Sequence, residues 1–229
     1  MTRGLFITGT DTGVGKTRTG TLLIRELRRC GLRVCPRKPV ESGCARQGNE
    51  LLPADALALR AAAGNREALD RVCAFPLAAP ISPTRAAALA GQSLNLDQLV
   101  AACRDEVGAE DFLVVEGAGG FLSPLTRDAL NADLAQRLGL PVVLVAADRL
   151  GAIHQVLVTA EAIERRGLLL AAVVLNQLDP ALDPRLDNAA ELAHWLGMAV
   201  IALPHQAGAG PLPQLAALAA LAEKLVHNR

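Results

Sequence analysis

The residues with the clearest chemical potential lie in the stretch GTDTGVGKT, which follows a short apolar run and precedes a segment with apolar residues at helical spacing. Gly13 and Gly15 would let backbone N–H groups approach phosphate oxygens, and the start of a helix adds a partial positive charge. Lys16 can reach the β- and γ-phosphates of a nucleotide, and Thr17 can place its hydroxyl on magnesium. The stretch therefore predicts a loop that binds the phosphates of a nucleotide.

The spacing of this loop differs from the common phosphate-binding pattern Gly-x-x-x-x-Gly-Lys-[Ser/Thr]. That pattern would place its first glycine at position 10, where the chain has Thr10, and the glycine stands instead at Gly9. The loop is thus one residue longer than the common pattern, while the strand before it and the helix after it are where a phosphate loop needs them.

Lysine is rare in this chain, because Lys16, Lys38 and Lys224 are the only lysines among 23 basic residues. Lys38 ends the strand candidate LRVCPRKPV and precedes a proline, which favours an extended backbone at that position. Because most basic residues of this chain are arginines, a lysine at position 38 indicates a role that needs a small ammonium group and that the larger, forked guanidinium group cannot fill. Ser42 follows at a turn where its hydroxyl could hold an oxyanion.

Four further residues are candidates, and three of them have an ordinary structural alternative. Glu116 ends the apolar run DFLVVE, where a buried carboxylate needs a cation such as magnesium. Asp55 is more simply explained as the first-turn acid of a helix. Asn176 could bind a nucleotide base or be a turn residue at a strand end. His154, on a predicted helix, is more consistent with a structural role than with catalysis.

Apolar runs and helical periodicities alternate along the chain. Strands are expected in LFIT, LRVCPRKPV, DFLVVEGAGG, LPVVLVAA, LLLAAVVLNQ and MAVIALP, and helices at 16–30, 54–64, 95–108, 152–166 and 213–226. This alternation predicts an α/β fold with a doubly wound, mostly parallel sheet flanked by helices. Ligands of such sheets lie beyond the carboxyl ends of the strands, where the loops of Gly15, Lys38 and Glu116 would gather. The segment 74–91 is expected to be the largest surface excursion.

Composition favours a single domain over residues 1–229. Apolar residues make up 51% and aromatic residues 2%, which suits an aliphatic core of helices on a parallel sheet. The formal net charge is zero without long runs of one sign, so neither nucleic acid nor a membrane surface is expected as a partner. An odd number of cysteines, five, and the absence of a leader-like start favour a cytoplasmic protein with reduced thiols.

The chain contains, in this order, the motifs GTDTGVGKT, RKPVESG, ADALAL, PISPT, VVEGAGG, PLT, LPVVLVA, LGAIHQVLVTAEAI, VLNQ and ALP. Together these motifs resemble the dethiobiotin synthetase family of biotin biosynthesis, which belongs to the P-loop NTPases. The longer loop is a mark of that family. The resemblance implies an ATP- and magnesium-dependent cyclo-ligase that converts 7,8-diaminopelargonic acid and carbon dioxide to dethiobiotin. The expected path runs through a carbamate and a carbamic-phosphoric anhydride, and the expected assembly is a homodimer with the substrate site at the interface.

The resemblance also implies roles for individual residues. Lys16 would bind phosphates, Lys38 would stabilise the carbamate and the transferring phosphoryl group, and Thr12 and Ser42 would contact the diamine or carbamate. The nucleotide would be bound by Gly13, Val14, Gly15, Lys16, Thr17, Asn176 and Pro204, and magnesium by Thr17, Asp55 and Glu116.

Three positions depart from the family pattern. His154 stands where asparagine is expected near the substrate's carboxylate tail, Thr84 replaces a histidine, and Gly13 replaces a glutamate. They affect the expected binding of the tail more than the reaction.

Two other classes share parts of this pattern. A glutamine-dependent amidotransferase would need a second domain, for which 229 residues leave no room. A switch ATPase of the partition or division-site type would carry a second lysine at the start of the loop, where this chain has Asp11. Such proteins often end in a basic amphipathic helix, whereas the C-terminal segment of this chain is mostly alanine and leucine. The ligase class is therefore favoured.

Overall fold

A six-stranded parallel sheet forms the centre of the computed structural model, which describes residues 3–181, 183, 185–205 and 213–227. The strand order is β10-β9-β8-β1-β7-β2. The strands are β1 (Arg3–Gly9), β2 (Val34–Arg37), β7 (Phe112–Glu116), β8 (Val142–Ala147), β9 (Leu170–Asn176) and β10 (Val200–Leu203). Because every pair is parallel, all six carboxyl ends meet at one edge.

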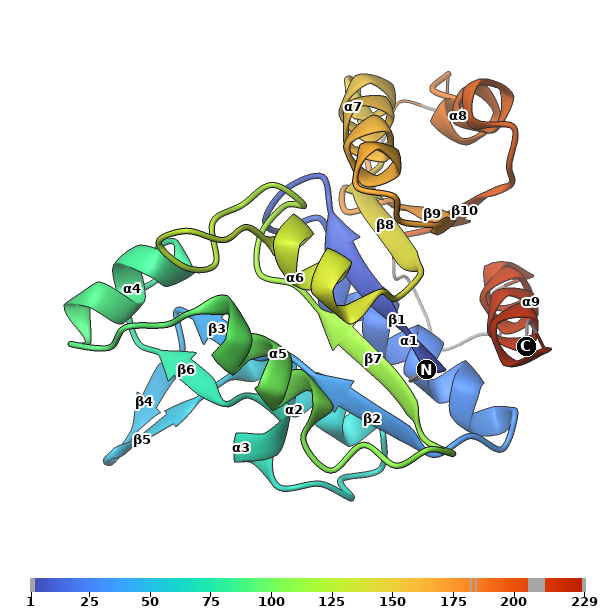
Figure 1. The fold of residues 1–229 in the computed structure, drawn as a ribbon. Helices are drawn as coiled ribbons and strands as arrows, with labels where there is room; N and C mark the ends of the chain where they lie inside the picture. The colour runs from blue at the N-terminus through green and yellow to red at the C-terminus, as the bar shows by residue number, and fades with distance from the viewer. Residues whose placement is uncertain (1–2, 182, 184, 206–212, 228–229) are drawn as a thin grey trace.

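Helices cover both faces of this sheet, as Figure 1 shows for α6 in front of β1 and β7 and α1 behind them. On one face lie α1 (Lys16–Arg29), α2 (Ala54–Ala62) and α9 (Pro213–His227); on the other lie α5 (Leu96–Arg104), α6 (Asn131–Leu138), α7 (Ala152–Arg165) and α8 (Asn188–Leu196). The doubly wound α/β class predicted from the sequence is confirmed. Each helix and central strand expected from periodicity is present, with end points shifted by a few residues.

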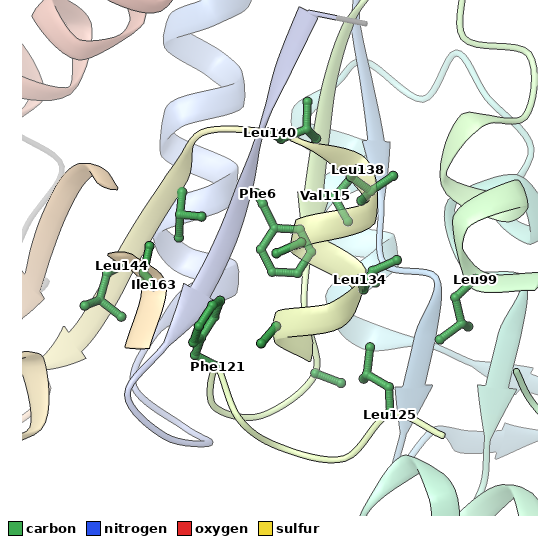
Figure 2. Close-up of a cluster of buried hydrophobic side chains, with 14 of the residues drawn as sticks. Phe6, Leu99, Val115, Phe121, Leu125, Leu134, Leu138, Leu140, Leu144 and Ile163 are labelled. Carbon is green, nitrogen blue, oxygen red and sulfur yellow. The ribbon is translucent and has the colours of Figure 1, made fainter. Parts of the chain in front are cut away.

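The central strand β1 shows why the sheet is buried on both sides. Leu5 and Ile7 belong to the apolar cluster under α1 and α2, whereas Phe6 points to the opposite cluster, and all three are fully buried. Figure 2 shows Phe6 beside α6, with Leu134 of that helix and Phe121 near by. A strand covered on both faces needs a continuous apolar run, which is what LFI supplies.

Several short strands and helices follow β2 in the chain, and the sequence did not predict them as separate elements. The segment LRVCPRKPV divides at Lys38 and Pro39 into β2, in the main sheet, and β3 (Val40–Ser42), which pairs with β6 (Phe75–Leu77) in a separate two-stranded sheet. The hairpin of β4 (Ala45–Gln47) and β5 (Glu50–Leu52), together with α3 (Leu69–Val72) and α4 (Pro83–Leu89), completes this side. The predicted excursion 74–91 is therefore β6 and α4, which flank the cleft described below.

All five cysteines are free thiols, and four of them are buried. Burial raises the pKa of Cys35 and of Cys103 to about 12 in each case, which keeps these thiols protonated and unreactive at neutral pH. Within residues 3–181, 183, 185–205 and 213–227, no helix is long and apolar enough to cross a bilayer.

Replacing Phe6 with alanine should lower the free energy of unfolding by about 3–5 kcal/mol, because a fully buried ring would leave a cavity between β1 and α6. Urea unfolding followed by circular dichroism measures the loss. Leu169→Ala is the matched control, since Leu169 is 66% exposed and its truncation should change stability by less than about 0.5 kcal/mol. Equal losses in the two variants would contradict the assignment of Phe6 to the core.

Candidate active site

The loop between β1 and α1 is shaped by two glycines with left-handed backbone. Gly13 has φ 75° and Gly15, at the N-cap of α1, has φ 87°, a region that other residues adopt at a cost. A Cβ on Gly15 would also lie 2.6 Å from the side-chain nitrogen of Asn176. Gly15 is therefore required both by the turn and by the close approach of β9.

The N-terminus of α1 is open toward the cleft. No side chain of the described residues caps it with a hydrogen bond, and no acidic residue stands in its first turn. The first N–H groups of a helix have no partner within the helix, and they attract anions together with the helix dipole. A bare helix start that follows a glycine loop is a phosphate-binding arrangement.

Lys16 is 6% exposed, and its Nζ donates a hydrogen bond of 2.9 Å to the carbonyl of Asp11 in the same loop. Burial, followed by the nearby positive charge of Lys38, lowers the pKa of Lys16 to about 8, although acidic neighbours act in the opposite direction. Without an anion, the ammonium of Lys16 is thus poorly stabilised. A phosphate group would supply the missing negative charge.

Lys38 lies between two carboxylates contributed by different elements. Its Nζ is 2.6 Å from Oε1 of Glu116, at the end of β7, and 3.0 Å from Oδ2 of Asp55, in the first turn of α2. Burial opposes the charged form of Lys38, but the two carboxylates outweigh it and raise the pKa of Lys38 above its usual value. The side chain is therefore a permanently charged ammonium in a nearly solvent-free position.

Glu116 and Asp55 form the acidic side of the site, together with the hydroxyl of Thr17. The Thr17 hydroxyl donates to Oε1 of Glu116 at 3.0 Å, and Oε2 of Glu116 is buried without a hydrogen-bond partner among the described residues. Although burial alone would raise it, the charge of Lys38 and hydrogen bonds hold the pKa of Asp55 below its usual value. Two carboxyl groups with a spare oxygen can accept a cation.

Glu41 is a residue that the sequence reasoning missed, although it stands in the motif RKPVESG. Its carboxylate accepts hydrogen bonds from the backbone N–H of Asp55 at 2.9 Å and of Ala56 at 3.0 Å, and so caps α2 from outside that helix. Burial raises the pKa of Glu41, while the two backbone N–H groups act against this shift. Glu41 thereby holds in place the helix turn that carries Asp55. A local pattern could not reveal a cap supplied 14 positions upstream.

A cleft of ≈ 590 Å³ joins these elements at the carboxyl edge of the sheet. It is lined by predicted site residues, namely Thr12, Gly13, Gly15, Lys16, Thr17, Lys38, Ser42, Asp55 and Glu116. Glu41 and a wall of Pro80, Ile81 and Ser82 complete the lining on one side, with Ala118 and Gly119 on another. The structure therefore gathers the residues predicted for phosphate, magnesium and substrate in one place.

Three predicted nucleotide contacts lie outside this cleft. Val14 and Asn176 are buried beneath the loop, and the Asn176 side chain donates to the carbonyl of Val14 at 3.0 Å and to the hydroxyl of Thr19 at 3.1 Å. Pro204 follows β10, and its carbonyl accepts a 2.7 Å hydrogen bond from Arg18. These residues surround the start of α1 on the side away from Lys38.

Two of the three departures from the family pattern, His154 and Thr84, lie apart from the reacting groups, whereas Gly13 lines the cleft. His154 is exposed in the first turn of α7, which has Gly151 at its N-cap and no acidic residue in its first turn. Thr84, in α4, donates its hydroxyl to the carbonyl of Thr126 at 2.9 Å. Neither side chain lines the cleft. His154 instead stands in the first turn of α7, whose start is capped by no side chain within the ranges that the structure describes.

Comparisons with known proteins agree with this geometry. A family model described as an AAA domain matches residues 3–211. The MinC:MinD cell division protein complex of Aquifex aeolicus is similar in structure, with a TM-score of 0.55, 14% identity and coverage of 99% of this chain and 96% of that chain. A ParA family ATPase from Chlorobium tepidum has a TM-score of 0.53 at 11% identity, with coverage of 99% and 100%. At such identities these likenesses show the fold alone, and the predicted P-loop NTPase type is confirmed.

Sequence relatives decide the family. The ATP-dependent dethiobiotin synthetase BioD of Anaeromyxobacter dehalogenans (strain 2CP-C) is 46% identical over 83% of this chain and 84% of the relative. The protein of the same name from Ruthia magnifica is 45% identical over 78% of this chain and 81% of the relative. The chain belongs to the ATP-dependent dethiobiotin synthetase family. The family predicted from the motifs, and with it the class of ATP-dependent ligases, is confirmed.

Binding of ADP should be accompanied by proton uptake at Lys16. The pKa of Lys16 is about 8 in the free protein and must rise when a phosphate group binds beside it. Proton uptake should therefore approach half a proton per ADP at pH 8 and be larger at pH 9. For the same reason, the affinity for ADP should fall as the pH rises from 8 to 9. Calorimetry in buffers of different ionisation enthalpy measures this proton number. Lys16→Ala should abolish binding, and proton-neutral binding at pH 8–9 would show that Lys16 is already fully charged.

Glu41→Gln should raise the magnesium concentration needed for half-maximal activity by about tenfold. The NH₂ group of glutamine cannot accept a hydrogen bond from a backbone N–H group at the start of α2, and a buried N–H group that loses its acceptor costs about 1–3 kcal/mol. Activity measured over a magnesium titration tests this, and ADP affinity without magnesium should stay unchanged. Glu50→Gln, at an exposed position in β5, is the control. An unaltered magnesium requirement in Glu41→Gln would remove the link between this cap and Asp55.

Proposed function

We propose that the chain acts in the cytoplasm, as a single domain over residues 1–229, to carboxylate 7,8-diaminopelargonic acid and close its ring to dethiobiotin at the expense of ATP. The observation that carries the proposal is the buried ammonium of Lys38, held 2.6 Å from Glu116 beside an open phosphate loop. Phosphoryl transfer needs positioned positive charge more than it needs a covalent nucleophile. A site that combines Lys16, Lys38 and a bare helix start supplies such charge.

ATP is proposed to bind with its phosphates over the loop. The N–H groups that follow Gly13 and Gly15 would surround the β-phosphate, and Lys16 would turn from the carbonyl of Asp11 to the phosphate oxygens. The γ-phosphate would then face Lys38, across the cleft. The expected roles of Val14, Asn176 and Pro204 around the nucleotide are supported by their positions at the start of α1.

The residues present also fit magnesium. Thr17, Asp55 and Glu116 converge on the cleft, and Oε2 of Glu116 is a buried oxygen that has no hydrogen-bond partner in the described part of the chain. The described residues hold no group of three or more His, Cys, Asp or Glu side chains suited to a metal. This agrees with magnesium, which uses one or two carboxylates and takes further ligands from water and phosphate. When bound, magnesium would neutralise charge on the β- and γ-phosphates.

The diamine is proposed to lie between Thr12 and Ser42, which line the same cleft as Lys38. One amine takes up carbon dioxide as a carbamate and releases a proton, and Lys38 would hold the resulting anion. A carbamate oxygen then attacks the γ-phosphorus, and ADP leaves. The second amine attacks the carbonyl carbon of the anhydride, a second proton is lost, and phosphate departs as the five-membered ring closes. Exclusion of water protects the anhydride, and the wall formed by Pro80 and Ile81 could contribute to it.

We further propose that two copies of the chain form a homodimer through the face that carries Leu122, Leu150 and Val158. These apolar side chains are 52%, 81% and 50% exposed, and Leu122 and Val158 line a second hollow of ≈ 360 Å³ beside the loop after β7. Apolar exposure of this kind is typical of a protein interface. The start of α7, with His154, would then lie over the partner's cleft, where an uncapped helix N-terminus suits a substrate carboxylate.

A direct test measures phosphate release from Mg·ATP in bicarbonate buffer with and without 7,8-diaminopelargonic acid, and identifies the product by mass spectrometry. We expect phosphate release that depends on the diamine, and one dethiobiotin for each phosphate. Slow release that is indifferent to the diamine, without dethiobiotin, would contradict the proposed reaction.

Lys38→Arg should lower kcat by about 100-fold while the affinity for ATP is retained, because a guanidinium fork cannot occupy the point-charge position between Glu116 and Asp55. Steady-state kinetics and equilibrium nucleotide binding separate these two effects. Lys224→Arg, at an exposed position in α9, is the matched control and should behave as the unmodified protein. Full activity of Lys38→Arg would remove this ammonium from the mechanism.

A further inference from the structure

Arg18 lies in the first turn of α1, two residues after Lys16, and connects the ends of two strands. Its Nη2 donates to the carbonyl of Pro204 at 2.7 Å, and its Nη1 lies 3.4 Å from Oδ1 of Asn176. Asn176 ends β9, and Pro204 follows β10. The half-buried guanidinium therefore stands at the carboxyl edge of the sheet, on the side of the loop opposite to Lys38.

The order of the strands indicates which part of a nucleotide would reach Arg18. β1 leads into the phosphate loop, and on one side of it lie β7, which ends at Glu116, and then β2, which ends just before Lys38. If the γ-phosphate faces Lys38, as the proposed function requires, the nucleoside extends to the other side, over β8, β9 and β10. Ligands of such sheets lie outside the carboxyl ends of the strands. The base would then lie at Asn176, Pro204 and Arg18.

The side-chain amide of Asn176 has a fixed orientation at this point. Its Nδ2 donates to the carbonyls of Val14 and Gly15, at 3.0 and 3.2 Å, and to the hydroxyl of Thr19 at 3.1 Å. Because three acceptors surround Nδ2, the amide cannot turn over without losing them. Its remaining acceptor, Oδ1, faces Arg18. The two acceptors that Asn176 and Pro204 offer to an amino group of a base, Oδ1 and the backbone carbonyl, are thus directed at the guanidinium.

We propose that Arg18 is the specificity-determining residue for the base, and that it admits 6-oxopurine nucleotides together with adenine nucleotides. A guanidinium carries five N–H donors and no acceptor. The guanidinium of Arg18 can donate a hydrogen bond to a carbonyl oxygen at C6 of the purine. The amino group at C6 of adenine must instead compete with this guanidinium for Oδ1 of Asn176 and the carbonyl of Pro204. The proposal rests on the proposed use of ATP, and it concerns the base alone, so the transferred phosphoryl group and the reaction stay the same.

Magnesium complexes of ADP and IDP provide the test, because adenine and hypoxanthine differ chiefly in the amino or carbonyl group at C6. Calorimetry gives the two Kd values for the unmodified protein, for Arg18→Ala and for Arg25→Ala, whose side chain is exposed on the same helix. The unmodified protein should bind the two nucleotides with Kd values within about threefold. A hydrogen bond from a charged group contributes about 1.5–3 kcal/mol, so Arg18→Ala should raise the ratio of the IDP Kd to the ADP Kd by tenfold or more.

Arg25→Ala should leave this ratio unchanged. The proposal is overturned if the ratio of the IDP Kd to the ADP Kd in Arg18→Ala stays within threefold of the ratio in the unmodified protein. It is also overturned if Arg18→Ala binds neither nucleotide. Folding is not expected to fail, because a cation at a helix N-terminus does not stabilise the helix. Dethiobiotin formation with ATP and with ITP separates the two claims. If the Kd ratio shifts as expected but no dethiobiotin forms, the proposed reaction is wrong and the role of Arg18 stands.

Discussion

The charge triad of Lys38, Glu116 and Asp55 is the constraint on which the rest of the site depends. Its ammonium is almost fully buried, with carboxylate oxygens at 2.6 and 3.0 Å, and it joins the ends of β2 and β7 to the start of α2. A buried charge that loses its partner costs several kcal/mol, so each of the three elements must hold its position for the other two. The triad therefore couples the folding of the sheet edge to the geometry of the cleft.

Other features of the site follow from this arrangement. The buried carboxylate of Glu41 holds the helix turn that carries Asp55, and the hydroxyl of Thr17 binds Glu116 from the other side. The charge of Lys38 also contributes to the lowered pKa of Lys16, after burial. Because the carboxyl groups of Glu41, Asp55 and Glu116 line the same cleft, the positive charge that can meet a polyanion such as a nucleotide comes from Lys16 and the bare helix start.

The sequence predicted what depends on local pattern. The loop and α1 were predictable because glycine, lysine and threonine stand in fixed order between an apolar strand and a helix. Lys38 was predictable because lysine is rare and Pro39 fixes the backbone. Glu41 and Arg18 were not predictable, because their contacts join residues 14, 158 and 186 positions apart, and no periodicity encodes such pairs. The division of one apolar stretch into β2 and β3 likewise depends on tertiary pairing with β7 and β6.

The scarcity of lysine also makes the charge triad directly measurable. Protein labelled with ¹⁵N at lysine contains only Lys16, Lys38 and Lys224, so their Nζ signals can be followed by NMR as the pH is raised and assigned with single Lys→Arg variants. We predict that Lys16 loses its proton near pH 8, while Lys38 remains charged beyond the usual range for lysine. Deprotonation of Lys38 at or below the ordinary lysine pKa would contradict the central role given to its pairing with Glu116 and Asp55.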